Sequence, residues 1–201
     1  MFNNFLLKDI NIDVPYEVRK YKASSTIFFE GDKMVYVGII EKGNIIIKTS
    51  NIDGYEFEIL TIKEGNIFGD MLAIANKDAL PGNIISSTDS TIVLFKNTDF
   101  IKLIMNNKEF LSRYLKYTAE LNIEKTYKIK LLGQASIREK IFFFMKEEIK
   151  KTGSNRVILN MTKEELATAM STNRPSLSRE LMRMKADGII DYDKKSITYL
   201  K

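Results

Sequence analysis

The chain has 201 residues, 44% of them apolar, a net charge of +5, and neither cysteine nor histidine. The missing cysteine excludes disulfides, thiolate zinc sites and cysteine-ligated iron–sulfur clusters, and the missing histidine removes the usual haem ligand and the commonest general base. The longest apolar cluster, residues 141–145, is far too short for a membrane span, and no signal peptide is evident, so a cytoplasmic location is expected.

The positive charge is concentrated at one end of the chain. From Gln134 onward there are 14 Lys and Arg against 9 Asp and Glu, whereas residues 1–133 carry 17 of each kind. A polyanion is therefore expected to bind the last third of the protein.

Residues 21–96 read as short strand-like runs separated by glycine-containing turns. Such turns stand at Glu30-Gly31-Asp32, Glu41-Lys42-Gly43 and Lys63-Glu64-Gly65. Turn signals at intervals of about 8–12 residues predict an all-β barrel or jelly roll. The segment from Ile67 is less regular, and Gly69-Asp70 within it suits a tight turn with a local cap.

The pattern becomes helical after Thr98, which is a good cap for a short helix over residues 99–105. Residues 108–132 then form a long stretch without proline or glycine. One seam at three- and four-residue spacing begins apolar and becomes polar: Leu111, Tyr114, Thr118, Leu121 and Lys125. This seam fits a parallel dimer, with the polar residues fixing its register, but it also fits a helix packed on its own β domain.

A hinge is expected at residues 133–135, followed by a capping box formed by Ser136 and Glu139. The helix that starts there should run to about Lys151. Its apolar residues are expected in a core: Ile137, Ile141, Phe144, Met145 and Ile149.

Residues 161–188 read as two short helices joined by a tight turn. Thr162 and Glu165 form a capping box, Asn173 caps the second helix, and Pro175 lies in its first turn, where a missing N–H costs little. Leu177, Leu181 and Met184 make one inward stripe. Two strands around Asp193-Lys194-Lys195 then suggest a wing. The pattern is that of a helix-turn-helix that reads DNA, although a helical hairpin packed in some other domain has the same periodicity.

Three segments in this order carry a family resemblance: IFFEGDKMVYVGIIEKGNIIIKT from residue 27, LTIKEGNIFGDM from residue 60, and MTKEELATAMSTNRPSLSRELMRMKADGII from residue 161. Together they resemble the Crp/Fnr family of bacterial transcription regulators. The resemblance implies an α+β fold with a jelly-roll-like β-roll in residues 1–107, a long dimerisation helix and hinge in residues 108–133, and a winged helix-turn-helix in residues 134–201. It implies a non-enzymatic homodimer that binds double-stranded promoter DNA, with RNA polymerase and an unidentified small molecule as further candidate partners.

The resemblance places base-reading side chains at the start of the second helix, at Arg174, Pro175, Ser176 and Arg179. Arginine can offer a bidentate fork to guanine O6 and N7. Hydroxyl and amide side chains nearby suit phosphate contacts: Thr162, Thr172, Asn173 and Ser178. Pro175 replaces the acidic residue common in the family, so the half-site is expected to differ there from the most familiar one.

The resemblance also suggests an effector pocket at Gly69, Asp70, Met71, Leu72, Leu80 and Gly82. Cyclic-nucleotide binders in the family pair Gly-Glu for the ribose with Arg-Ser for the phosphate, but residues 76–96 contain no arginine. A buried phosphate without a guanidinium is costly, which argues against cyclic AMP or cyclic GMP. No cofactor and no metal is predicted. The competing hypotheses are a ligand sensor whose winged domain binds a protein, and an enzyme on the β-roll, for which no catalytic constellation is seen.

Overall fold

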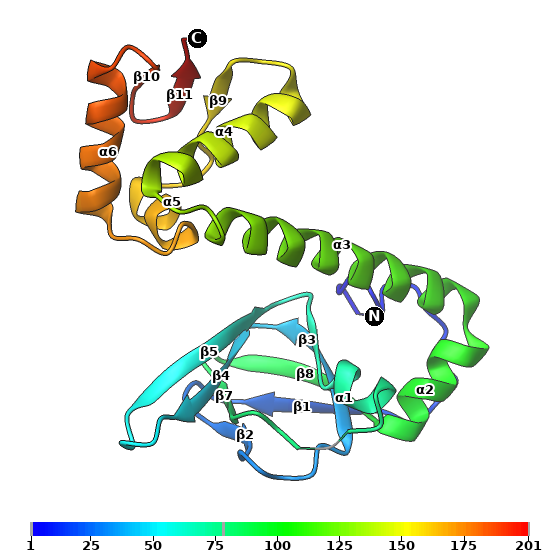
Figure 1. Cartoon of the computed structure of the whole chain (residues 1–201). Coiled ribbons are helices and arrows are strands. Elements are labelled where there is room, and N and C mark those ends of the chain that lie inside the picture. Colours follow the sequence, from blue (N-terminus) through cyan, green and yellow to red (C-terminus); the bar gives the residue numbers. More distant parts are fainter. Residues whose placement is uncertain (1, 78, 201) are drawn as a thin grey trace. The chain divides into compact units, whose positions relative to one another are not determined.

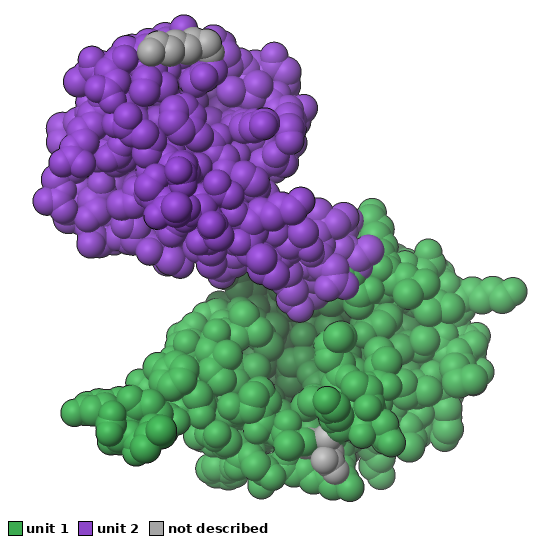
Figure 2. Space-filling model, viewed as in Figure 1, with its two compact units in different colours: residues 1–118 green, residues 119–201 purple. Residues whose placement is uncertain are grey.

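The computed structural model describes residues 2–77 and 79–200 and divides the chain into two compact units, residues 1–118 and 119–201 (Figures 1 and 2). The first unit is built mainly of strands, and the second combines helices with a small sheet. Helix α3 (Lys108–Leu132) contributes residues to both units, as one uninterrupted helix. The expected mixed α+β fold is confirmed.

The first unit contains two four-stranded antiparallel sheets (Figure 1). One sheet has the order β1-β8-β3-β6, with strands Glu17–Tyr21, Ser90–Lys96, Tyr36–Lys42 and Ile67–Phe68. The other has the order β2-β7-β4-β5, with strands Thr26–Phe28, Asn83–Ser86, Asn44–Ser50 and Glu56–Lys63. Most of these strands coincide with the runs that the glycine spacing indicates, but β1 and β7 were not predicted. Strand β1 escapes recognition because it is a polar, largely exposed edge strand with little apolar alternation.

The sheet containing β3 and β8 is buried on both of its faces. Successive side chains of a strand point to opposite faces, so Ile92 and Leu94 join a cluster shared with β4, β5 and β7, while Val93 and Phe95 join a second cluster. The shared cluster is the interior between the two sheets. The second cluster is covered by the N-terminal segment, helix α2 (Asn97–Asn106) and the start of α3.

Gly38, in the middle of β3, lies against the ring of Phe68. A Cβ atom at residue 38 would stand 2.2 Å from the nearest ring carbon. The ring therefore occupies the space that any other side chain at this position needs.

The predicted cap at Thr98 is wrong. Helix α2 begins two residues earlier than expected, at Asn97, and its N-cap position is Lys96, which makes no side-chain cap hydrogen bond. Instead, the side-chain Nδ2 of Asn97 donates to the carbonyl oxygen of Met34 at 2.8 Å, which ties the start of α2 to the segment before β3. A long-range contact thus replaces the local cap.

The second unit holds helices α4 (Ile137–Thr152), α5 (Lys163–Ala169) and α6 (Arg174–Ala186), together with a sheet of order β10-β11-β9. Its strands are β9 (Arg156–Ile158), β10 (Ile190–Tyr192) and β11 (Ser196–Tyr199). The two wing strands were expected, whereas the third partner, β9, was not. One apolar cluster joins all three helices to this sheet, and Ile141, Leu166 and Leu181 are among its buried members.

Candidate nucleic-acid interface and effector region

The start of α5 is fixed by the predicted capping box. The backbone N–H of Thr162 donates to Glu165 Oε2 at 2.7 Å, and the backbone N–H of Glu165 donates to Thr162 Oγ1 at 3.2 Å. Asn173 caps α6 in the same way, because its Oδ1 accepts from the backbone N–H of Ser176 at 2.9 Å. Both helix starts are therefore held by local hydrogen bonds that satisfy free N–H groups.

The first turns of α6 display the residues expected to read bases. Arg174, Pro175 and Arg179 are exposed, and Ser176 is partly so. Within the described part of the chain Arg174 makes no side-chain hydrogen bond or ion pair, while Arg179 Nη2 donates to Ser176 Oγ at 3.2 Å. The apolar stripe of Leu177, Leu181 and Met184 is fully buried. Arg179 lies on the side of α6 away from this stripe, and Arg174 is exposed at the N-terminal end of the helix.

The four residues predicted to bind phosphate differ in how freely their side chains can do so. The Thr162 hydroxyl and the Asn173 amide oxygen already take part in the helix caps. Ser178 and Thr172 are partly buried. Their contacts with phosphate stay predictions, and backbone N–H groups of the same turns are additional donors of the kind that phosphates accept.

Helix α4 makes polar contacts with both helices of the motif, which the sequence patterns did not reveal. Lys140 Nζ donates to the carbonyl oxygen of Met170 at 2.9 Å, at the C-terminal end of α5. Arg138 forms ion pairs with Glu180 of α6 at 2.5 Å and with Asp187, the C-cap residue of α6, at 2.9 Å. Arg138 and Glu180 are 42 positions apart in the chain. Helical periodicity carries no information about such distant partners.

The seam predicted on α3 needs one correction. Tyr114 is 5% exposed and lies in the core of the first unit, where its ring contacts Phe100 and Phe110. It is therefore not available to a second chain. The apolar residues that α3 exposes lie elsewhere on the helix, at Leu115, Ile123 and Ile129.

Tyr114 also provides the hydrogen bond that satisfies Asp70, one of the predicted effector residues. The hydroxyl of Tyr114 donates to Asp70 Oδ2 at 2.7 Å, and Asp70 is only 7% exposed. Burial, followed by the neighbouring Asp70, raises the pKa of Tyr114 far above its usual range. One turn further, the Tyr117 hydroxyl donates to Asn66 Oδ1 at 3.0 Å and accepts from the backbone N–H of Ile67. Two tyrosines thus attach α3 to the segment around β6.

The other predicted effector residues do not gather around one space. Leu80 is buried and Leu72 packs against the cluster between the sheets, while Met71 at the start of α1 (Asp70–Ile74) is 64% exposed. Gly69 has a φ of +79°, and a Cβ there would stand 2.7 Å from the carbonyl oxygen of Tyr36. Gly82 is similarly close to the backbone of β4. These glycines serve close backbone packing, in agreement with the tight turn expected at Gly69.

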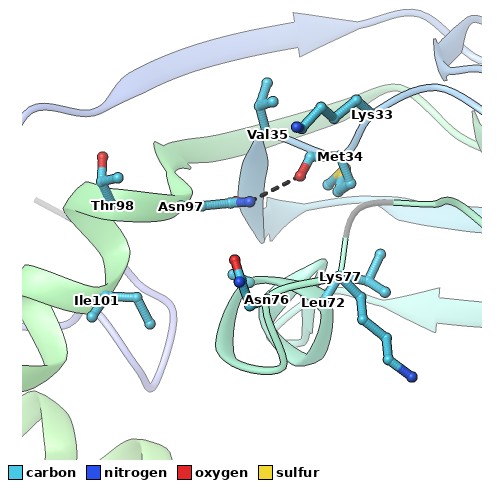
Figure 3. A pocket seen from close by; sticks show the side chains of 10 residues that line it. Lys33, Met34, Val35, Leu72, Asn76, Lys77, Asn97, Thr98 and Ile101 are labelled. Atoms are coloured by element: carbon cyan, nitrogen blue, oxygen red, sulfur yellow. Dashed lines mark hydrogen bonds between the residues drawn. The ribbon is translucent and has the colours of Figure 1, made fainter.

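A cavity of about 390 Å³ lies outside the interior between the sheets, beside the start of β3, α1 and the start of α2 (Figure 3). Its lining includes Val35, Leu72, Asn97 and Ile101. Lys77 also lines it, but the side chain extends away from the other lining residues (Figure 3). Lys33 is the other lysine of the lining, and no arginine is among the lining residues.

Two further observations concern the described residues only. Residues 2–77 and 79–200 contain no group of three or more acidic side chains arranged to hold a metal ion. None of the helices among them combines the length and the apolar character of a membrane span.

Comparisons with known proteins agree with this geometry. The family model of the cyclic nucleotide-binding domain matches residues 18–107, and that of the Crp-like helix-turn-helix domain matches residues 140–201. The transcriptional activator protein FnrL of Cereibacter sphaeroides is 24% identical over 187 residues, which cover 88% of this chain and 73% of FnrL. The cyclic AMP receptor protein of Thermus thermophilus is 17% identical over 191 residues, which cover 94% of this chain and 87% of that protein.

Two solved structures share the fold. A CooA variant from Carboxydothermus hydrogenoformans aligns with a TM-score of 0.56 at 16% identity, covering 92% of this chain and 84% of that one. A transcriptional regulator from Thermotoga maritima aligns with a TM-score of 0.51 at 21% identity, covering 58% of this chain and 91% of that one.

The two domain models match in the order in which the two units follow one another, and the helix-turn-helix match contains the capped helices α5 and α6. The chain belongs to the Crp/Fnr family of transcription regulators.

Proposed function

We propose that the protein regulates transcription as a homodimer that recognises a specific DNA sequence through the N-terminal turns of α6. The observation that carries this proposal is the pair of exposed arginines in the first two turns of α6, Arg174 at its N-terminal end and Arg179 opposite its fully buried stripe. A capped, rigidly packed helix can place both guanidinium groups in the major groove without large rearrangement. Ser176 and Pro175 complete the proposed reading surface.

The test uses DNA that the full-length protein selects from a library of random duplexes. We expect Arg174→Ala plus Arg179→Ala to lower the affinity for the selected duplex at least about tenfold, because each bidentate contact with guanine is worth about 1–3 kcal/mol. Lys150→Gln is the matched control, since Lys150 pairs with Glu147 inside α4 itself. Unchanged affinity of the double variant for the selected duplex would show that α6 is not the reading helix.

The dimer seam is proposed on the exposed side of α3. Leu115, Asn122 and Ile129 are spaced by seven residues and are all exposed. Seven-residue spacing is that of one core position of a coiled-coil heptad, and a polar residue such as Asn122 at that position fixes the register. Sedimentation of Leu115→Glu plus Ile129→Glu should show monomers at concentrations where the wild type is dimeric. A dimeric double variant would place the interface elsewhere.

The effector is proposed to be something other than a cyclic nucleotide. Asp70 is already satisfied by Tyr114, Leu72 and Leu80 pack against the interior, and residues 76–96 supply no arginine. A cyclic phosphate placed there would lose its hydration without gaining a guanidinium. Titration calorimetry with cyclic AMP and cyclic GMP at millimolar concentration should give no binding heat, and saturable binding of either compound would refute this part of the proposal.

A further inference from the structure

Arg138 connects α4 to α6 and to the C-cap residue of α6. Its Nε lies 2.5 Å from Glu180 Oε1, and its Nη1 lies 2.9 Å from Asp187 Oδ2. Glu180 lies within α6 and Asp187 is its C-cap, seven residues later, so they lie near the same face, about 10 Å apart along the helix axis. One planar guanidinium therefore holds both the middle of α6 and its C-cap.

The contact with Glu180 is well shielded from solvent. The Glu180 side chain is 14% exposed, and its other oxygen lies 3.5 Å from Arg183 Nη1. The hydrogen bonds that Arg138 donates to Glu180 and then to Asp187 raise its pKa, as expected for a guanidinium held by two carboxylates. Without Arg138, Glu180 of the reading helix would keep only the longer contact with Arg183.

Apolar packing alone does not set the rotation of α6 as sharply as these bonds do. Leu177, Leu181 and Met184 bury one stripe of the helix, but the hydrophobic effect is non-directional. Hydrogen bonds of a guanidinium fork are directional and weaken steeply with poor alignment. The ion pairs lie on the flank of α6, beside the apolar stripe, where they can fix the direction in which Arg174 and Arg179 point.

We propose that Arg138 is a positioning residue for sequence recognition, which holds α6 in the rotation at which its exposed arginines meet the bases. This role rests on the proposed function of α6 as the reading helix. It predicts that loss of Arg138 lowers the preference for the selected sequence more than the affinity for DNA in general. Contacts with phosphates tolerate a small rotation, whereas bidentate base contacts do not.

Two other roles for Arg138 give different results. If Arg138 bound a phosphate itself, its loss would weaken binding to all duplexes and reduce the salt dependence of binding by about one counterion. If it only stabilised the domain, the melting temperature would fall and the ratio of affinities would stay constant. The ratio of the dissociation constants for a scrambled and a selected duplex therefore separates the three roles.

The experiment measures this ratio for the full chain and for Arg138→Gln, Arg138→Lys, Asp187→Asn and the control Lys150→Gln, at two salt concentrations. For Arg138→Gln we expect the ratio to fall about tenfold, within the range of coupling energies for residues in one ion-pair network. The salt dependence should not change. Lys150→Gln removes the same charge from α4 but breaks only a pair within that helix, so its ratio should equal that of the wild type.

Arg138→Lys keeps the charge but cannot hold both acids with one planar group, so its ratio should also fall. Full retention of the ratio in Arg138→Lys would overturn the positioning role, because charge alone would then suffice. Should Arg138→Gln fail to fold, Arg138→Lys and the milder Asp187→Asn decide, since Asp187 is 48% exposed and its replacement disturbs little. An unchanged ratio in both would refute the proposal.

The controls separate this inference from the proposed function. If the wild type selects no sequence, or if Arg174→Ala plus Arg179→Ala keeps the preference, the proposed reading helix is wrong. If that double variant loses the preference while the Arg138 variants keep it, only the positioning role of Arg138 is wrong.

Discussion

Replacement of Tyr114 by phenylalanine tests how firmly the long helix is attached to the β-roll. The change removes the hydroxyl that donates to Asp70 at 2.7 Å and keeps the ring, whose edge-to-face contact with Phe100 has a centroid separation of 5.7 Å. Asp70 is 7% exposed, so water cannot readily replace the lost donor. We expect the free energy of unfolding of the first unit to fall by about 1–3 kcal/mol, the cost of an unsatisfied buried polar group.

Amide hydrogen exchange measured by mass spectrometry is the suitable assay, because it assigns the loss to individual elements. The strongly protected amides of β3 and β8 should exchange faster in Tyr114→Phe, while those of α4 and α6 should not change. Tyr117→Phe is the comparison variant, because its hydroxyl bonds only to neutral groups: it loses the bond to Asn66 and the longer bond from the Ile67 N–H, each worth about 0.5–1.5 kcal/mol.

A double-mutant cycle with Asp70→Asn then isolates the pair. If the hydrogen bond is the cause, the two changes should be strongly non-additive, with an interaction energy of about 1 kcal/mol or more. A loss below about 0.5 kcal/mol in Tyr114→Phe, or strict additivity in the cycle, would refute the reasoning, since ordinary surface changes have effects of that size.

Three further results are expected. The raised pKa of Tyr114 means that the folded state favours the neutral phenol. The stability that this group contributes is therefore present below the ordinary tyrosine pKa of about 10 and is lost as pH rises above it. Between pH 9 and 11, the free energy of unfolding measured in urea should fall less for Tyr114→Phe than for the wild type. Asn173→Ala should cost about 1 kcal/mol by removing the cap of α6, seen as faster amide exchange at Ser176, and unchanged exchange there would contradict the capping role. Gly69→Ala should lower the urea midpoint through a loss of about 2 kcal/mol or more, because the new Cβ meets a backbone oxygen at a φ of +79°; an unchanged midpoint would argue against this account.

Features that depend on neighbouring residues could be predicted from the sequence. The capping box of Thr162 and Glu165 and the cap at Asn173 form between residues three positions apart, so their spacing in the chain is nearly their geometry. The stripe of Leu177, Leu181 and Met184 follows from the helical period alone and is buried as expected. The order of a glycine-punctuated β region, a long helix and a helix-turn-helix then sufficed to indicate the family.

Features that depend on distant partners could not be predicted. The periodicity of α3 predicts an apolar seam, but it does not indicate whether a second chain or the chain's own β domain covers that seam. The sequence therefore places Tyr114 at a dimer interface, whereas in the structure Tyr114 contacts Asp70 and Phe100. The pairing of β9 with β11 and the bridge from Arg138 to α6 likewise join segments that are far apart in the chain. Local secondary-structure propensity does not predict such contacts, because their energy comes from tertiary packing.

The contact between Gly38 and Phe68 has a consequence for how this protein can change over evolutionary time. The ring at residue 68 fills the volume in which a side chain at residue 38 would have to lie. A side chain introduced at residue 38 alone would clash with the Phe68 ring, and truncation of the ring alone would open a cavity, so each single change is unfavourable. The two positions should therefore vary as a pair: a relative with a side chain at the first should carry a smaller residue at the second. An alignment of relatives would test this, and frequent pairing of a phenylalanine at residue 68 with a branched residue at residue 38 would contradict it.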